Sequence, residues 1–272
     1  PVIAPDLSIS QAGGSFTTIG GQTRNRLAAI DIGGSVTDWN LDANNYVKTL
    51  EINNDTIYVG GGFTSVGSQI RNGLAAINVG GSLTSWNPNI GGGVYDLLFD
   101  ASNNKMYAGG SFNSVGGQTR NYLAAIGIDG SLTSWDPNAD NEIIALAVNN
   151  DIVYVGGNFT KVGGQNRNYL AAIDTGGSVT SWNPNASGTV NALAVNNDII
   201  YTGGYFSLVG NQTRNRLAAI DVGGSLTLWN PDADYTVSTL EIGNSIIYAG
   251  GWFNAVGGET RNYLAAIDMG GS

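Results

Sequence analysis

The chain has 272 residues, of which 41 are glycine and only 12% are charged, against roughly 25% charged residues in average proteins. Its net charge of −10 would repel a phosphate backbone, and no apolar run approaches the roughly 20 residues that cross a bilayer, so we expect neither nucleic-acid binding nor a membrane span. Cysteine and histidine are both absent, which excludes disulfides, Ser–His–Asp triads, Cys–His nucleophiles and most zinc sites.

One phrase recurs along the whole chain. It reads "GGQTRNRLAAID" at its first occurrence, Gly20–Asp31. The arginine inside it recurs in steps of 47, 49, 47, 47 and 47 residues, at Arg24, Arg71, Arg120, Arg167, Arg214 and Arg261. The two extra residues fall in "FDASNNKMY", where we predict a turn, since turns tolerate insertions better than paired strands.

The fourth repeat shows the predicted elements most clearly. In chain order they are an apolar run at Glu142–Val148, a β-branched and aromatic run at Ile152–Phe159, an apolar run at Tyr169–Asp174 and an alternating run at Ser178–Pro184. Turn residues separate them, and a Gly-rich loop, "TKVGGQNRN", joins the second run to the third. Four short strands per repeat predict an all-β, six-bladed β-propeller of four-stranded antiparallel blades, forming a single domain over residues 1–272.

The ends of the sequence bear on the first and last blades. The N-terminal residues align without gaps to Asn191–Phe206 and predict the first two strands of blade one. The sequence stops at Ser272, so we expect the sixth blade to lack its outer strand within this chain and Tyr263–Asp268 to form an edge. A longer chain, a bare edge or a strand from another subunit would each fit, and the last would give a polymer.

The wording "GGNFTKVGGQNRNYLAAIDTGGSVTSWNPN" resembles the delta-sixty repeat of bacterial and archaeal secreted and surface proteins. The resemblance covers essentially the whole chain and implies a β-propeller, although each unit is shorter than the family's usual repeat. The segment "AAIDIGGSVTDW" is also similar to the tryptophan-docking motif of quinoprotein propellers. Gly34 and Ser35 replace that motif's Thr-Gly, so the similarity implies tryptophan packing and no quinone cofactor.

Aromatic residues recur with the repeat, which favours an architectural role over a catalytic one. Six of the seven phenylalanines follow the Gly-Gly pairs, and a tryptophan ends the fourth run in five repeats, at Trp39, Trp86, Trp135, Trp182 and Trp229. We predict that these rings pack between blades, each burial contributing about 2–3 kcal/mol. Sugar stacking by these tryptophans is the alternative.

The repeated arginines have two interpretations. A fixed bridge to the acidic residue seven positions on fails, because that position holds Asn78 and Gly127 in two repeats. We favour a latch, in which each guanidinium donates to backbone carbonyls of the Gly-rich loop. The alternative is a ring of cations around the channel that binds an anion.

A binding site should lie where the repeats differ. The residue between Gly-Gly and Phe varies as Ser15, Gly62, Ser111, Asn158, Tyr205 and Trp252. The residue after Arg-Asn varies as Arg26, Gly73, Tyr122, Tyr169, Arg216 and Tyr263. Tyr205 and Trp252 belong to adjacent blades and could form an exposed aromatic pair for a glycan or a protein, with Tyr263 as a further candidate. The alternative is that they fill local gaps.

The sequence predicts a non-catalytic protein located outside the cell or on its surface. We favour a structural or assembly propeller that self-associates or meets a surface partner, such as a filament or surface-layer subunit. The alternative is a glycan- or protein-binding module, as in lectins and adhesins. An enzyme is the least favoured class, because the acidic residues are scattered over turns. We expect no catalytic residues, no metal ligands and no cofactor; the Asp/Asn-rich turns match no calcium loop spacing.

Overall fold

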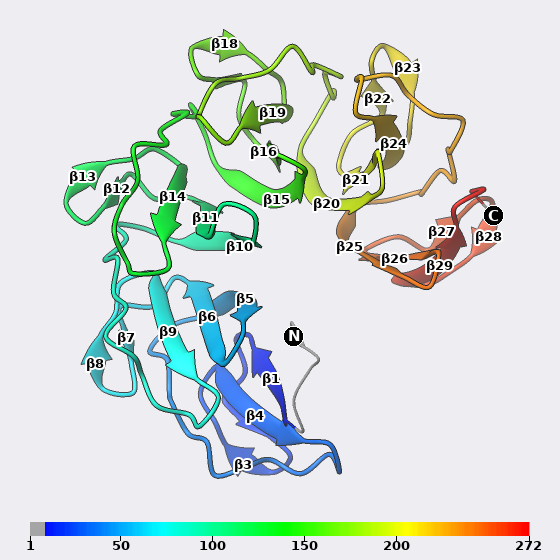
Figure 1. The fold of residues 1–272 in the computed structure, drawn as a ribbon. Coiled ribbons are helices and arrows are strands. Elements are labelled where there is room, and N and C mark those ends of the chain that lie inside the picture. Colours follow the sequence, from blue (N-terminus) through cyan, green and yellow to red (C-terminus); the bar gives the residue numbers. More distant parts are fainter. Residues whose placement is uncertain (1–8, 272) are drawn as a thin grey trace. The chain divides into compact units, whose positions relative to one another are not determined.

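The structure is a computed structural model that describes residues 9–271 (Figure 1). Its contacts divide the chain into two compact units, residues 1–136 and 137–272, so that each unit holds three repeats. The first strand predicted for blade one falls on residues 1–8, outside the described residues. Within residues 9–271 no helix is long and apolar enough to cross a membrane.

Leaving aside the small hairpins described below, which are sheets of their own in both units, the described residues of unit 1 form one two-stranded and two three-stranded antiparallel sheets. The first pairs β1 (Ile9–Gly13) with β4 (Leu27–Asp31). The second has the order β5 (Val47–Asn53), β6 (Thr56–Gly61) and β9 (Leu74–Asn78). The third has the order β10 (Val94–Asp100), β11 (Lys105–Gly110) and β14 (Leu123–Gly127). The two extra residues of the third repeat lie in the turn between β10 and β11, which confirms the predicted turn.

Unit 2 contains three sheets of three antiparallel strands. The first has the order β15 (Ile143–Asn149), β16 (Ile152–Gly157) and β19 (Leu170–Asp174). The second consists of β20 (Val190–Asn196), β21 (Ile199–Gly204) and β24 (Leu217–Asp221). The third consists of β25 (Val237–Gly243), β26 (Ile246–Gly251) and β29 (Leu264–Asp268).

The Gly-rich loop of every repeat folds into a small hairpin of its own. The hairpins of unit 1 are β2–β3 (Thr18–Ile19, Gln22–Thr23), β7–β8 (Ser65–Val66, Gln69–Ile70) and β12–β13 (Ser114–Val115, Gln118–Thr119). Those of unit 2 are β17–β18 (Lys161–Val162, Gln165–Asn166), β22–β23 (Leu208–Val209, Gln212–Thr213) and β27–β28 (Ala255–Val256, Glu259–Thr260). Two residues with positive φ form each tip, as tight hairpins require.

The fourth strand of the blade is shorter than the sequence predicts. In the fourth repeat it is reduced to one bridge, Ile173 with Val179. The first, second, third and fifth repeats each have one equivalent bridge. The reason is local: the Thr180 carbonyl accepts an N–H from the Arg167 guanidinium instead of extending the ladder. Pro184, further on, has no N–H to donate. Among the described residues, β29 of the sixth repeat has no such outer bridge.

The Gly-Gly pairs sit where other chain segments approach closely. A Cβ on Gly157 would collide with the carbonyl oxygen of Glu142, in the connection that enters the same blade. A Cβ on Gly156 would lie 2.6 Å from Cγ1 of Val190, in the next blade. The first glycine therefore permits packing between blades and the second lets the entering chain cross the end of the strand.

The hydrophobic clusters lie between neighbouring blades rather than inside single sheets. One cluster of unit 2 joins Tyr154 and Trp182 of the fourth repeat to Ile200 and Phe206 of the fifth. The indole N–H of Trp182 donates to the Asp221 carbonyl of the next blade at 2.9 Å. Equivalent bonds run from Trp86 to Gly127 and from Trp229 to Asp268. In each repeat from the second to the fifth a tyrosine meets the tryptophan edge-on, with ring centroids 4.9–5.1 Å apart.

Candidate functional site

The repeated arginines form the backbone latch. All six donate from one guanidinium nitrogen to the carbonyl of the preceding residue. Five of them also donate to a carbonyl in the outer segment, thirteen residues on: Arg24 to Thr37, Arg71 to Thr84, Arg120 to Thr133, Arg167 to Thr180 and Arg214 to Thr227. These bonds hold the outer segment against the blade, and they use guanidinium N–H donors that an anion-binding ring would need.

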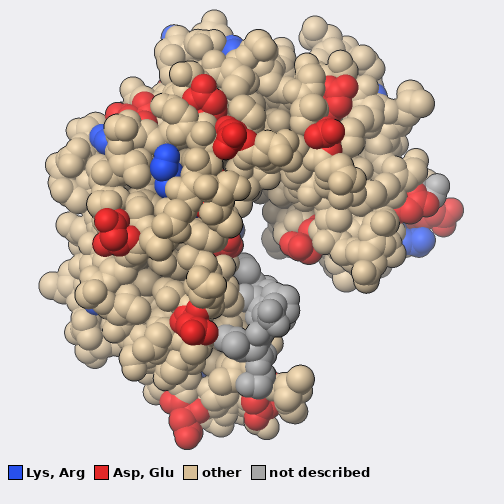
Figure 2. Space-filling view, in the orientation of Figure 1, with Lys and Arg blue, Asp and Glu red and all other residues tan. Residues whose placement is uncertain are grey.

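Charged side chains do not gather into an obvious site. In Figure 2 they are few and are separated by wide uncharged areas. Within residues 9–271 no group of three or more acidic residues is placed to hold a metal ion. The surface that a ligand meets is therefore made mainly of amides, hydroxyls, backbone and a few aromatic rings.

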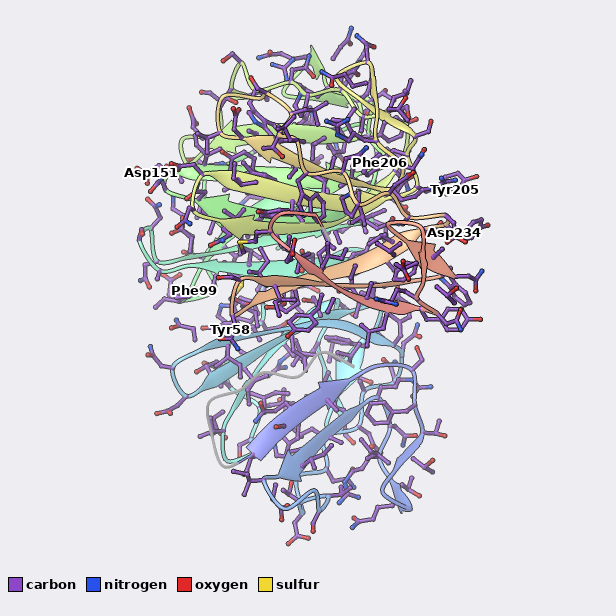
Figure 3. All side chains as sticks on the ribbon, turned by 90° about the vertical axis from the view of Figure 1, so that its right-hand side faces the viewer. Tyr58, Phe99, Asp151, Tyr205, Phe206 and Asp234 are labelled. Atoms are coloured by element: carbon purple, nitrogen blue, oxygen red, sulfur yellow. The ribbon has the colours of Figure 1, made fainter. Side chains whose placement is uncertain are left out.

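Three aromatic side chains stand out on the surface of unit 2: Tyr205, Tyr235 and Trp252, which we call the aromatic row. Their exposed fractions are 57%, 51% and 69%. Large aromatic side chains are normally buried, and exposed ones that lie close together are typical of contact surfaces. Tyr205 projects from the molecule at the same edge as Asp234, the neighbour of Tyr235 in the chain (Figure 3).

Backbone hydrogen bonds fix the positions of Tyr205 and Trp252. Tyr205 follows the last glycine of β21, and its N–H donates to the Thr189 carbonyl at 2.8 Å. Trp252 follows β26 in the same way, and its N–H donates to the Thr236 carbonyl at 2.9 Å. Both residues therefore stand where the entering connection crosses the end of the blade.

Tyr235 contacts Tyr205 and precedes the residue that bonds the Trp252 backbone, and sequence reasoning missed it. Its ring meets that of Tyr205 edge-on, with centroids 6.3 Å apart and planes at 68°. It immediately precedes Thr236, which accepts the Trp252 N–H. The ring partner of Tyr205 is thus Tyr235, and no ring contact between Tyr205 and Trp252 is found among the described residues. The signal was available, because the same position holds Asn45, Gly92, Asn141 and Gly188 in other repeats.

A hollow of about 230 Å³ lies beside Tyr205. It is lined by Ser187, Tyr205, Phe206, Ser207 and Arg216. The Arg216 guanidinium donates to the Ala233 carbonyl at 3.4 Å, so its aliphatic stem bridges the fifth blade and the connection that carries Tyr235. Hydroxyl groups, an aromatic ring and a cation thus line one small hollow.

The third candidate, Tyr263, occupies a different kind of position. It has a positive φ of 68° and is 59% exposed. Its N–H donates to the Phe253 carbonyl, and its own carbonyl accepts the Gly251 N–H, so its backbone lies beside the base of Trp252. The ring contacts found in the described residues do not include Tyr263, and we leave it outside the aromatic row.

The carboxylate nearest to the row in sequence is already engaged. Asp234 Oδ1 accepts the backbone N–H groups of Asn254 at 2.8 Å and Ala255 at 3.1 Å. The hydrogen bond from Ala255, followed by that from Asn254, lowers the pKa of Asp234. A carboxylate held in this way stays ionised and serves as a loop cap, which suits it poorly to general acid chemistry.

Two comparisons with known proteins, a family model and the solved structure of a WD40 domain, agree with the repeated blades. The family model described as "Domain of unknown function (DUF5122) beta-propeller" matches residues 101–132 and 152–179. The WD40 β-propeller domain of Doa1 aligns with a TM-score of 0.62 and 14% identity, over 91% of this chain and 73% of that chain. The computationally designed Ika4 protein aligns with a TM-score of 0.42 and 16% identity, over 64% of this chain and 90% of that chain. No curated protein matches the sequence.

These findings define the class of the protein. It is an all-β propeller built from five to six blade units of about 47 residues. At 14% identity, the likeness to the Doa1 domain concerns the fold alone.

Proposed function

We propose that the chain is a non-catalytic, glycan-binding propeller module that acts outside the cell or on its surface. The observation that carries the proposal is the aromatic row, in which three exposed rings stand on a surface of amide and hydroxyl groups. Tyrosine and tryptophan combine an apolar face with a polar group, which matches the apolar faces and hydroxyls of a sugar ring. The hollow beside Tyr205 supplies further hydroxyls.

The low charge of the surface supports a neutral ligand at the row. Only 12% of the residues are charged, and the latch and the Asp234 cap engage several of them. A protein partner would gain from complementary charges at the rim of the interface, whereas a neutral sugar needs hydrogen-bonding groups and a flat apolar ring.

A glycan array probed with the full chain tests this proposal. We expect one group of neutral glycans to bind the parent, and Tyr235→Ala and Trp252→Ala to weaken that binding at least tenfold, about 1.4 kcal/mol. Ile32→Ala is the matched control, because Ile32 is 93% exposed but lies far from the row in sequence, in unit 1. Equal binding by all four proteins, or binding to no glycan, would refute the proposal.

Self-association is a second candidate function, and one observation favours it. Leu264 on β29 is 66% exposed and Tyr248 on β26 is 40% exposed, whereas their counterparts Leu217 and Tyr201 are 0% and 5% exposed. A second copy of the chain that packs on this face would bury apolar area worth about 25 cal/mol per Å². Sedimentation over a range of concentrations tests it: Leu264→Asp should abolish association, and a parent that stays monomeric would exclude this function.

A further inference from the structure

The connection that enters a blade carries a capping side chain in four repeats. One oxygen of this side chain accepts two consecutive backbone N–H groups at the start of the small hairpin. The capping residues and their donors are Asn44 with Thr64 and Ser65, Asp140 with Thr160 and Lys161, Ser187 with Ser207 and Leu208, and Asp234 with Asn254 and Ala255. The cap is therefore a regular part of the blade, with distances of 2.8–3.1 Å.

The third repeat keeps a backbone hydrogen bond of this arrangement and omits the side chain. Gly91 occupies the capping position, and its N–H donates to the Ser114 carbonyl at 2.9 Å, as that of Asn44 does to Ser65. The corresponding donors are the N–H groups of Asn113 and Ser114. That of Asn113 makes a longer bond of 3.3 Å to the Gly91 carbonyl. Among the backbone hydrogen bonds of the described residues, none has the Ser114 N–H as its donor.

The register of the hairpin directs the Ser114 N–H toward Gly91. Val115 and Gln118 flank the two-residue turn, so they form the hydrogen-bonded pair of β12 and β13. Ser114 and Thr119 then form the next, non-bonded pair, and the Ser114 N–H points out of the hairpin. The donors of Asn113 and Ser114 beside Gly91 make up what we call the Gly91 notch.

Glycine at position 91 is not required by the backbone, because its φ lies outside the left-handed region. A Cβ there would collide with the hydroxyl of Ser114, which can rotate away. The second repeat shows this, since Asn44 and Ser65 coexist at the same two positions. The missing cap therefore opens a polar space rather than relieving strain.

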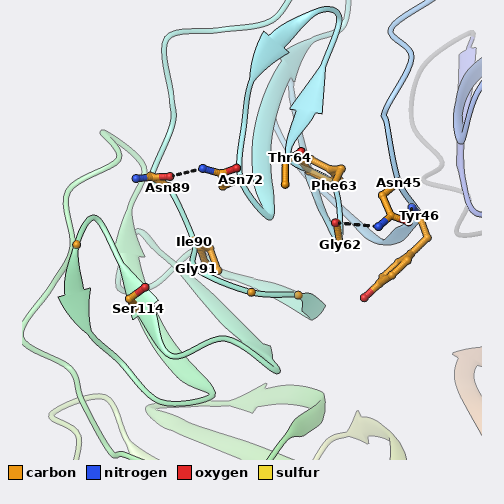
Figure 4. Close-up of a pocket in the computed structure, with 13 residues that line it drawn as sticks. Asn45, Tyr46, Gly62, Phe63, Thr64, Asn72, Asn89, Ile90, Gly91 and Ser114 are labelled. Atoms are coloured by element: carbon orange, nitrogen blue, oxygen red, sulfur yellow. Dashed lines mark hydrogen bonds between the residues drawn. The ribbon is translucent and has the colours of Figure 1, made fainter.

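The notch opens into a cavity of about 500 Å³ in unit 1 (Figure 4). Glycines form much of its wall, since Gly62 and Gly91–Gly93 line it at positions where most other repeats have larger residues. The half-buried ring of Tyr46 forms one side. The corresponding hollow in unit 2 has a volume of about 280 Å³. A ligand of several rings therefore has more room in the cavity of unit 1.

The groups around the cavity match an acidic sugar. Paired N–H donors favour a charged oxygen, since the same arrangement lowers the pKa of the Asp234 carboxyl. At the rim, Asn72 donates one amide N–H to Asn89 Oδ1 at 2.7 Å, so each amide keeps another polar atom for a sugar hydroxyl. No residue that lines the cavity is charged, so no lining carboxylate repels an anion.

We propose that the Gly91 notch binds the carboxylate of an acidic sugar residue. The ligand's carboxylate replaces the side-chain cap found in the other repeats and accepts the N–H groups of Asn113 and Ser114. The sugar ring lies over Tyr46, and its hydroxyls bond the amides of Asn72 and Asn89. This site is independent of the aromatic row, which belongs to the other unit and suits a neutral sugar.

Amide chemical shifts of the isotope-labelled full chain test the proposal, with galacturonate, galactose and acetate as probes. We expect galacturonate to shift the Asn113 and Ser114 signals with a Kd of ~1 mM. Galactose lacks the carboxylate and acetate lacks the ring, so each should bind about tenfold more weakly or not at all. Equal responses to galacturonate and galactose would overturn the carboxylate contact, and equal responses to galacturonate and acetate would overturn the sugar.

Two matched variants add an independent check. Gly91→Asn rebuilds the Asn44 cap and should abolish the response while the other amide signals stay dispersed. Ser187→Gly opens the equivalent position in the fifth repeat and should give new carboxylate-dependent shifts at Ser207 and Leu208. Retained galacturonate binding in Gly91→Asn would refute the proposed position of the ligand, whatever the second variant does.

Discussion

The connections that enter β10 and β25 occupy the same place in their repeats and present different surfaces. Before β25, Asp234 caps the hairpin and Tyr235 adds an exposed ring to the aromatic row. Before β10, Gly91 and Gly92 occupy the same two positions and leave donors and a hollow. The comparison shows how a repeat protein can vary its surface. The latch and the packed rings maintain the blade, whereas a few loop positions determine which groups are exposed to a ligand.

The largest expected effect separates buried rings from exposed ones. Trp182→Ala should lower the free energy of unfolding by about 3–5 kcal/mol, because the ring is 5% exposed and its N–H bonds the next blade. Trp252→Ala should change it by less than ~0.5 kcal/mol, because that ring is 69% exposed. Urea unfolding monitored by circular dichroism measures both. Similar losses of unfolding free energy in the two variants would contradict the distinction between the buried tryptophans of the scaffold and the exposed Trp252 of the aromatic row.

A pH effect should distinguish unit 1 from unit 2. Glu51 on β5 accepts the Phe99 N–H of β10 at 3.0 Å, and burial raises the pKa of its carboxyl from 4.5 to about 7 (Figure 3 labels Phe99). Its counterparts in unit 2 are Ala147 on β15, Ala194 on β20 and Glu241 on β25, and of these the one carboxyl, that of Glu241, belongs to an exposed residue. The folded state holds this proton more tightly than the unfolded state, so the contribution of Glu51 to stability is largest at low pH.

The contribution of Glu51 should be lost as the pH rises from about 4.5 through about 7. The shift corresponds to about 3 kcal/mol at most. Glu51→Gln keeps an acceptor for the Phe99 N–H and should remove this part of the pH dependence, leaving a variant more stable than the parent at pH 8. Parallel stability curves for parent and variant across this range would contradict the assignment.

Substitutions in the latch should have intermediate effects. Lysine at position 167 cannot reach the Asn166 and Thr180 carbonyls and the Gln165 side chain together, so Arg167→Lys should cost about 1–3 kcal/mol. Arg261 is exposed and makes one of these bonds, so Arg261→Lys should cost less than ~0.5 kcal/mol. Thermal unfolding of the two variants measures the difference, and equal midpoints would argue against the latch.

The smallest effects concern the cap itself. Ser187→Gly removes an acceptor from two N–H groups and should destabilise the protein by about 1 kcal/mol. Gly91→Asn supplies that acceptor in the third repeat and should stabilise it by about 0.5–1 kcal/mol. Opposite shifts of the unfolding midpoint are expected. A destabilised Gly91→Asn would mean that the notch cannot accept the cap of the second repeat.

Repetition made much of the scaffold predictable from the sequence. The period of the repeat predicted the strands and the tryptophan packing, since both patterns recur several times in one chain. The one departure from the period predicted the turn of the third repeat. The outer strand was overestimated, because its alternation looks like a strand while its Thr180 carbonyl binds Arg167. Tyr235 and Gly91 were missed for another reason. The variation at the position of Tyr235 was visible in the repeats, but the contact of its ring with Tyr205 was not. The role of Gly91 depends on which backbone N–H groups lie opposite it, and a sequence pattern does not reveal those partners.

The fluorescence of Trp252 tests the glycan-binding proposal most directly. Trp252 is 69% exposed, whereas Trp86, Trp135, Trp182 and Trp229 are 2–6% exposed. A neutral glycan identified on the array should shift the emission to shorter wavelength and protect it from acrylamide quenching, and Trp252→Phe should abolish the change. A glycan that binds without altering the emission, or that alters it equally in Trp252→Phe, would show that the sugar does not contact the aromatic row.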